Sequence, residues 1–392
     1  MEHAGSALEE FRAEVRQFIT DHAPRIDYRA GVRSAENEQD EKRLNHWAAR
    51  LFDAGYVGAD WPKEYGGRDG WTAEHGIVVG EELARAKVSG VASGNALAAN
   101  ALIAFGTEEQ RKRHLPRIRA CQEKWCQLFS EPSAGSDLAS LRTKAVLQGD
   151  IYRISGQKVW TTDGQWSQFG YLLARTDPDA PKHKGISAFI LDMGTPGVSV
   201  RPLRELTGTS DFNEVFLDDV EVPAANMIGN PGQGWAIANA TLAHERSGVG
   251  ALAVKLRLTL EALTSLAGRT IIGDRPALDS DRIRDRIGDF TAQVEALSAL
   301  IATNISRWSR GAERQHDAAM TKLMFSELNL AIVTFAVELA GEDGVLVDGD
   351  PNAQERGYWQ DEWLYARAYT IAGGSSEIMR NLIAERGLGL PR

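Results

Sequence analysis

Apolar residues recur at helical intervals in the first third of the chain. Ser6 and Glu9 have the spacing of a capping box, and an apolar face follows them. That face consists of Leu8, Phe11, Val15, Phe18 and Ile19. Thr107 and Gln110 have the same spacing and begin another expected helix. We therefore predict an N-terminal α-helical domain over residues 1–125.

The pattern changes after residue 125. Short runs of alternating or β-branched residues follow, at 151–154, 185–190, 198–200 and 214–217. Turn dipeptides separate these runs, for example Gly149-Asp150 and Asp177-Pro178. We interpret residues 126–230 as an antiparallel β domain rather than a series of βαβ units.

Long helical periods return in the last part of the chain. One apolar stripe has spacings of four, three, four, three and four residues. It consists of Ile283, Ile287, Phe290, Val294, Leu297 and Ile301. A second long helix is expected from near Met320 to Ala340. The fold class is therefore α+β and multidomain, with a C-terminal helical bundle over residues 231–392.

Composition narrows the classes of function. Hydrophobic residues make up 43% and charged residues 25%, as in a folded globular protein. We find no apolar block long enough to span a bilayer and no secretory signal, so we expect a cytoplasmic protein without a membrane span. The net charge of −10 argues against nucleic acid as a partner, but it permits an anionic small ligand in a local basic pocket.

Several cofactor signatures are missing. No Gly-x-Gly-x-x-Gly follows an expected strand, and there is no Walker loop. His244-Glu245 begins like a zinc signature, but the second histidine would fall at Gly248. Cys121 and Cys126 are too few for a disulfide framework or a zinc ribbon, so we expect reduced thiols. We assign no metal site.

Two segments of the β domain carry candidate chemistry. The run Ser130–Asp137, Ser-Glu-Pro-Ser-Ala-Gly-Ser-Asp, is a small-residue loop whose backbone N–H groups can approach a ligand closely. The run Lys158–Gly164 places Trp160 beside two hydroxyls, which suits the face and edge of a planar cofactor. On these residues alone, an ordinary Gly/Ser turn and a core tryptophan remain alternatives.

Together these segments resemble the flavin-binding pattern of the acyl-CoA dehydrogenase family. The resemblance extends to 106–110 upstream and to 221–223 and 371–380 downstream, in order and with matching spacings. It implies a helical domain, a β domain with flavin-binding loops and a C-terminal four-helix bundle that carries the base and the oligomer interface. Members usually form tetramers with FAD at a subunit interface.

The resemblance also implies individual roles. The positions that match FAD contacts are Phe129, Ser130, Gly135, Ser136, Trp160, Thr162, Arg269, Glu338, Gly341, Ser375 and Glu377. Thr162 would lie at the flavin N5 edge, and Ser136 near the flavin or the pantetheine arm of the substrate. Arg246 and Gly373 match substrate-binding positions.

The catalytic base needs a separate argument. In the best-known members it is a Glu at the position of Gly373, which has no side chain to act as a base. A branch that includes the isovaleryl- and long-chain enzymes instead has a Glu just before an Arg, as in Glu245-Arg246 here. Glu245 shares a helix face with Leu242, Val249 and Leu252, and desolvation there should raise its pKa. The alternative is a Glu245–Arg246 pair on a solvated face, although adjacent helix residues do not face each other.

Two other family elements are altered. The family's Arg-x-x-Phe becomes Arg269–Gly273 without the Phe, and its Gln-x-x-Gly-Gly becomes Glu338–Glu342. An acidic side chain there would repel a pyrophosphate. The chain therefore forms either a homotetramer or, by hypothesis, a heterotetramer with a related chain that completes the FAD site.

The resemblance implies FAD-dependent dehydrogenation of an acyl-CoA to the trans-2-enoyl-CoA, with electron-transfer flavoprotein as acceptor. The base position favours a branched or bulky acyl chain, in fatty acid or sterol side-chain degradation. Within the same fold, a flavin oxidase or a dehydrogenase of carrier-protein thioesters is an alternative. A non-catalytic partner subunit is an alternative of another class.

Overall fold

The computed structural model describes residues 2–24, 34–243, 249–308, 310–312, 314 and 316–391. Its N-terminal part is helical, as predicted. The helices are α1 (Glu2–His22), α2 (Glu38–Asp53), α3 (Ala73–Arg85), α4 (Ser93–Phe105) and α5 (Glu108–Arg119). The capping box before α5 is confirmed, because Thr107 and Gln110 each accept a hydrogen bond from the other's backbone N–H. The capping box at Ser6 is wrong, because α1 already begins at Glu2.

The middle of the chain forms one sheet. Its strands are β1 (Trp125–Leu128), β2 (Lys144–Gln148), β3 (Ile151–Thr162), β4 (Phe169–Arg175), β5 (Ile186–Asp192), β6 (Val198–Leu203), β7 (Phe212–Pro223) and β8 (Met227–Ile228). Their order is β6-β7-β3-β2-β4-β5-β8, with β1 beside β4. The two-residue turn at Gly149-Asp150, with Gly149 at φ +66°, joins β2 to β3.

Most pairings in this sheet are antiparallel, as predicted, but two are parallel. β1 runs parallel to β4 along its whole length, and Lys144 of β2 pairs in parallel with Arg175 of β4. β1 enters the sheet from the helical domain and pairs with a strand that is not its sequence neighbour. No turn dipeptide marks such a pairing, so the local pattern does not contain it.

The last part is a helical bundle, as predicted. Its elements are α6 (Gly234–Ala243), α7 (Val249–Arg269), α8 (Asp281–Trp308), α9 (Asp317–Ala340), α10 (Tyr358–Ile371) and α11 (Ser376–Leu382), with a short hairpin of β9 (Ile271–Ile272) and β10 (Arg275–Pro276). All six residues of the apolar stripe on α8 are buried in a core shared with α7, α9 and α10.

One expectation about membranes needs correction. The segment Asp317–Val345, which contains α9, is long and apolar enough to cross a membrane by length and composition, with a mean hydropathy of 1.6. Within the bundle α9 packs against α7, α8 and α10, and its Phe325, Leu328 and Ile332 are buried. A helix that contacts neighbours on several sides is apolar around much of its circumference, which accounts for the composition.

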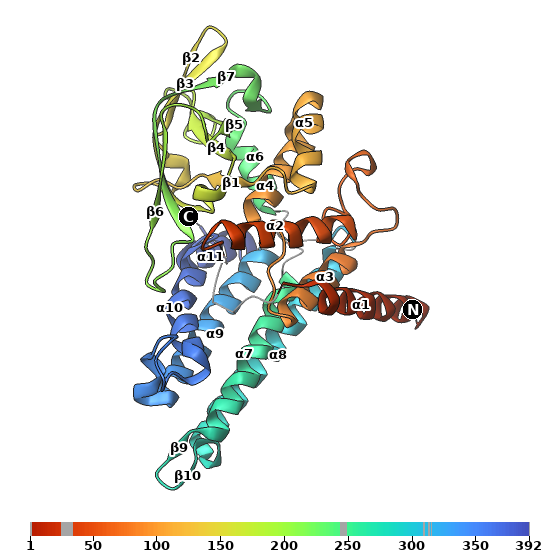
Figure 1. Cartoon of the computed structure of the whole chain (residues 1–392), viewed down its shortest axis with the longest axis vertical. Coiled ribbons are helices and arrows are strands. Elements are labelled where there is room, and N and C mark those ends of the chain that lie inside the picture. Colours follow the sequence, from red (N-terminus) through yellow and green to blue (C-terminus); the bar gives the residue numbers. More distant parts are fainter. Residues whose placement is uncertain are drawn as a thin grey trace.

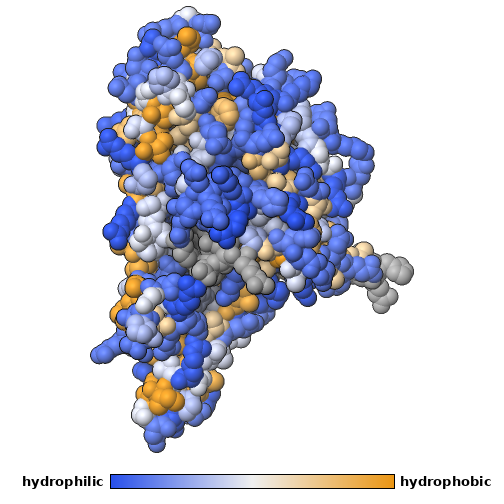
Figure 2. Space-filling model, viewed as in Figure 1, coloured by the Kyte–Doolittle hydropathy of each residue, from blue (hydrophilic) through white to orange (hydrophobic). Residues whose placement is uncertain are grey.

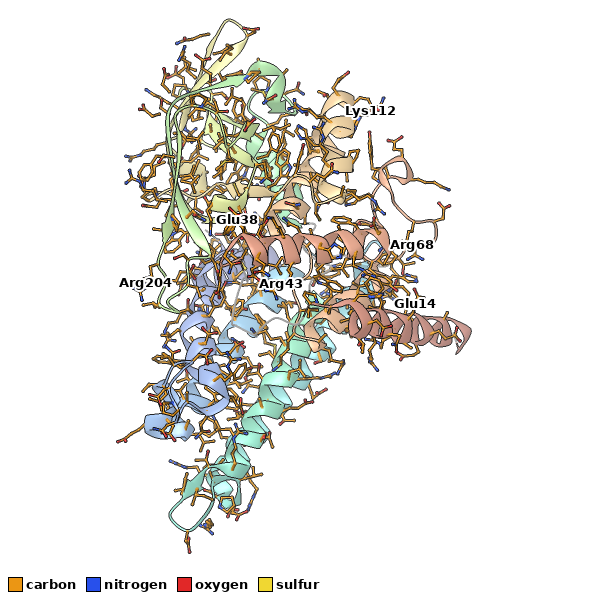
Figure 3. The ribbon with its side chains drawn as sticks, in the orientation of Figure 1. Glu14, Glu38, Arg43, Arg68, Lys112 and Arg204 are labelled. Atoms are coloured by element: carbon orange, nitrogen blue, oxygen red, sulfur yellow. The ribbon has the colours of Figure 1, made fainter. Side chains whose placement is uncertain are left out.

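The β domain and the hairpin β9–β10 lie at opposite ends of the long axis of the molecule (Figure 1). Between them, the N-terminal helices cross the bundle. The hairpin tip carries an apolar patch, visible at the lower end in Figure 2, where Ile271 and Ile272 are exposed. From the connection between β6 and β7, Arg204 projects outward (Figure 3), and Thr207–Thr209 share a cavity with Tyr358 of α10.

The buried stripe on α8 predicts a measurable cost of truncation. Phe290 is 1% exposed, so Phe290→Ala is expected to lower the free energy of unfolding by about 3–5 kcal/mol, through lost burial and the cavity left behind. Urea denaturation followed by far-UV circular dichroism measures this change. Asp285→Ala, on the exposed face of the same helix, is the control and should change it by less than about 0.5 kcal/mol. If the two variants lowered the free energy of unfolding equally, the assignment of Phe290 to the buried face of α8 would be wrong.

Candidate active site

The loop after β1 lies against the end of β3. The backbone N–H of Val159 donates to the carbonyl of Ser130 at 2.9 Å, and Glu131 and Ala134 exchange backbone hydrogen bonds across the turn. Gly135 and Ser136 are exposed, and a Cβ added at Gly135 would meet nothing within 4 Å. The loop therefore presents a backbone edge that a flat ligand can approach.

Trp160 is the most unusual residue of this edge. Its side chain is 62% exposed, and its φ of +59° lies in the left-handed region, which a bulky residue rarely adopts. The strand pairing with β7 shifts register between Lys158 and Thr161, so the bulge turns the indole out of the sheet. Strain of this kind at an exposed aromatic indicates a functional constraint.

Thr162 ends β3, two residues after Trp160. It is half-buried, and its backbone pairs with Phe212 of the neighbouring strand β7. The next residue, Asp163, also has φ +59°, and the Asn213 amide donates to the carbonyl of Thr161 at 3.0 Å. These contacts fix the direction in which the strand ends. The structure thus brings Ser130, Trp160 and Thr162 to one edge of the β domain.

Phe129 contributes to this edge in another way. Its side chain is 3% exposed and packs edge-on against Tyr171, with ring centroids 4.9 Å apart. The ring therefore belongs to the core beneath the loop. Its carbonyl oxygen accepts a hydrogen bond from Lys158 Nζ at 3.1 Å.

Lys158 and Glu131 form a buried ion pair beneath the loop, which was not predicted from the sequence. Lys158 Nζ lies 2.8 Å from Glu131 Oε1, and both residues are buried. Burial lowers the pKa of Lys158 to about 8, while Lys158 and nearby backbone N–H groups hold the pKa of Glu131 below its ordinary value against its own burial. The alternation of Tyr152, Ile154 and Lys158 on the inward face of β3 was a signal that could have identified it.

A second group of predicted residues lies where α10 meets α11. Gly373 and Gly374 have φ of +67° and +101°, and Lys322 Nζ on α9 donates to the carbonyl of Gly374 at 2.5 Å. Ser375 caps α11 by accepting from the N–H of Ile378. Backbone N–H groups at this helix start, together with Ser375, lower the pKa of the exposed Glu377.

A groove of about 660 Å³ runs from this junction along α9. Glu327, Glu338 and Glu377 line it together with Arg286 and with apolar side chains that include Phe335 and Ile371. The structure therefore brings Glu338 and Glu377 to one surface. That surface carries several carboxylates, of which Glu338 belongs to the altered family motif.

Arg269 and Gly341 lie elsewhere. Arg269 is at the end of α7 next to β9, at the opposite end of the molecule from the β domain (Figure 1). Its guanidinium binds Ser265 Oγ at 2.9 Å and forms an ion pair with Glu355. Gly341 ends α9 at φ +62°, with open space where a Cβ would be. One chain thus does not bring Arg269 to Trp160 and Thr162.

The expected base lies outside the described residues. α6 ends at Ala243 and α7 begins at Val249, and Glu245 and Arg246 fall between them in the part that the structure does not describe. Their roles stay predictions. Across the described ranges, no group of three or more His, Cys, Asp and Glu side chains could hold a metal ion.

Comparisons with known proteins agree over the whole chain. Three family models match it: the N-terminal domain of acyl-CoA dehydrogenase over residues 6–122, the middle domain over 126–220 and the C-terminal domain over 232–388. The acyl-CoA dehydrogenase IpdE1 of Mycobacterium tuberculosis is 40% identical over 394 residues, which cover 98% of each protein.

Two solved structures are similar throughout. The Tcur3481-Tcur3483 steroid ACAD superposes with a TM-score of 0.88 at 30% identity, covering 99% of this chain and 98% of that one. The ChsE4-ChsE5 complex from Mycobacterium tuberculosis gives a TM-score of 0.85 at 30% identity, covering 98% of each chain.

The strained backbone at Trp160 has a testable consequence. Trp160→Gly removes a left-handed strain of about 1–2 kcal/mol, and the exposed indole loses little buried area, so the free energy of unfolding of the ligand-free chain should rise by up to about 1 kcal/mol. Val146→Gly is the control: Val146 is 50% exposed in the same sheet, and glycine there should lower stability by about 0.5–1 kcal/mol. If urea denaturation shows that both variants lose the same stability, the backbone of Trp160 does not carry this strain.

Proposed function

The chain belongs to the acyl-CoA dehydrogenase family, and we propose that it oxidises a branched or bulky acyl-CoA to the trans-2-enoyl-CoA with FAD as cofactor. The observation that carries the FAD assignment is the edge formed by the Ser130–Asp137 loop and the exposed, strained Trp160. We keep residues 1–125, 126–230 and 231–392 as the three domains, a division that the ranges of the family matches support.

The residues of this edge suit the flavin ring. Trp160 presents a flat aromatic face, and the open backbone at Gly135 and Ser136 leaves room for a ring system and its hydrogen bonds. Thr162 places a hydroxyl at the end of the strand, next to the position of the ring edge. When bound, FAD supplies the acceptor for the hydride that leaves the β-carbon of the substrate.

The base removes the α-proton from the other side of the substrate. We assign this step to Glu245, and we assign Arg246 to holding the CoA portion. Removal of the α-proton places negative charge on the thioester oxygen, and hydrogen-bond donors aimed at that oxygen stabilise the enolate. Glu245 shares its expected helix face with aliphatic residues, which suits a carboxylate whose pKa is raised towards neutrality.

Gly373 supports a bulky acyl group. In the commonest family pattern this position carries the Glu base, and here a Cβ would meet nothing within 4 Å. With Glu245 as the base in place of this position, the space beside Gly373 stays free for the acyl group. Two solved relatives, one of them described as a steroid ACAD, share 30% identity with the chain, which is consistent with a large acyl group. Sterol side-chain degradation in the cytoplasm, with electron-transfer flavoprotein as acceptor, is the setting that we propose.

We further propose that the functional unit is a heterotetramer with a related chain. Arg269 is paired with Glu355 and lies at the end of α7 opposite the β domain (Figure 1), so an FAD that contacts both Arg269 and the β-domain edge would lie between two chains. Glu338 and Glu342 replace neutral residues of the family pattern and would repel a pyrophosphate. A partner chain with the neutral pattern would complete the site at this chain's β domain. A solved relative that is a complex of two named chains supports this proposal.

The base assignment is tested by Glu245→Gln in the FAD-loaded assembly. Loss of the carboxylate should slow anaerobic flavin reduction by an acyl-CoA with a bulky acyl group by about 10²–10⁴-fold, because no other group abstracts the α-proton. Stopped-flow absorbance of the flavin measures the rate, and FAD content should not change. Glu261→Gln, an exposed carboxylate on α7, is the matched control. An unchanged rate in Glu245→Gln would instead favour a non-catalytic role for this chain.

The assembly is tested by expressing the chain alone. Size-exclusion chromatography and the flavin spectrum should show substoichiometric FAD, and Glu338→Gln should increase the FAD retained, because it removes a charge beside the pyrophosphate. Glu109→Gln on α5, far from the groove, should leave the FAD content unchanged. A yellow homotetramer with one FAD per chain would overturn the heterotetramer. Fast reoxidation of the reduced flavin by air would indicate an oxidase.

A further inference from the structure

The buried side chain of Lys158 has a defined set of contacts. It lies on the inward face of β3, in line with Tyr152 and Ile154, and is 0% exposed. Its Nζ donates to Glu131 Oε1 at 2.8 Å and to the carbonyl of Phe129 at 3.1 Å. The ammonium group thus joins β3 to the start of the Ser130–Asp137 loop from beneath.

The Glu131 carboxylate extends the connection to a third segment. Its Oε2 accepts from the backbone N–H of Arg142 at 2.6 Å, and its Oε1 accepts from the N–H of Thr143 at 2.9 Å. The backbone bond from Val159 to Ser130 closes the arrangement on the other side. The start of the loop, the segment just before β2 and the strand that carries Trp160 are therefore fixed to one pair of charges.

Stability alone is a poor explanation for this pair. Two charges removed from water lose much of their hydration energy, and apolar residues of similar volume often replace a buried pair without loss of stability. Lys158 pairs with the buried Val215 of the neighbouring strand β7, so it lies in an apolar part of the sheet. What apolar side chains do not reproduce is the set of directed hydrogen bonds to Phe129, Arg142 and Thr143.

We propose that Lys158 and Glu131 are positioning residues that hold the Ser130–Asp137 loop against the Trp160–Thr162 segment in the geometry that receives the flavin. Neither side chain touches the ligand. They act through the backbone of the loop and through the strand end. The flavin part of this inference rests on the proposed function, whereas the ordering of the loop does not.

The first test uses the cofactor-free chain. In Glu131→Gln, which keeps the shape and removes the charge, amide hydrogen exchange in residues 130–143 should become at least about tenfold faster. Lys255→Met is the matched control, because Lys255 pairs at 3.2 Å with the buried Glu362 between α7 and α10. It should leave exchange in 130–143 unchanged. Equal exchange in wild type and Glu131→Gln would overturn the positioning role even if no assembly of this chain bound FAD.

A double variant separates positioning from stability. Lys158→Met combined with Glu131→Leu removes both charges together, so its melting temperature should be higher than that of Glu131→Gln, which leaves the Lys158 charge buried without its partner. Exchange at Arg142 and Thr143 should remain fast, and the Kd for FAD of the assembly should stay at least about tenfold higher, because the directed hydrogen bonds are absent. Full recovery of FAD affinity by this apolar pair would show that the ion pair only contributes stability.

The dependence on pH gives a third readout. Glu131 is the charged group that contacts Lys158, and burial lowers the pKa of Lys158 to about 8. Above that pH the ammonium loses its proton and the pair loses its attraction, so the Kd for FAD should rise between pH 7.5 and 9. The rise should be missing in the double variant, which has no group to titrate there. A rise of the same size in both proteins would contradict the assignment.

Discussion

The ion pair between Lys158 and Glu131 joins parts of the chain that lie 27 residues apart and carries no solvent-exposed charge. Hydrogen bonds have a preferred direction. An ammonium and a carboxylate in an apolar part of the sheet must therefore form theirs with nearby backbone groups. Those groups belong to the loop and strand end that form the candidate flavin edge. The strained backbone of Trp160 lies two residues after Lys158, and such strain requires surroundings that are held in place.

A second constraint is the distance between the β domain and Arg269, which we propose as two parts of the flavin site. The β domain and the end of α7 that carries Arg269 lie at opposite ends of the long axis of the chain (Figure 1), and Arg269 is already paired within that chain. We therefore propose that catalysis requires an assembly, in which this chain contributes the β-domain edge and the base. In our proposal, the open space beside Gly373 leaves room for a bulky acyl group.

Local physics predicted much of the fold. The capping box at 107–110 and the buried stripe of α8 follow from hydrogen bonds and periodicity within a few residues, and both were confirmed. The parallel pairing of β1 with β4 was missed because its partners are distant in sequence. Lys158 was overlooked because a lysine in a strand is usually exposed, although its inward register indicated burial. Glu245 came from the family resemblance, since helical periodicity alone left a solvated ion pair equally open.

The most direct measurement is the pKa of Lys158 itself, from an NMR titration of the chain with ¹³C-labelled lysine, assigned by comparison with Lys158→Met. A fully buried ammonium paired with Glu131 should titrate at about 8, well below its ordinary value of 10.5, and the pKa should fall further in Glu131→Gln because the attracting charge is gone. A pKa near 10.5 that does not respond to Glu131→Gln would mean that the pair is not buried and does not organise the flavin edge.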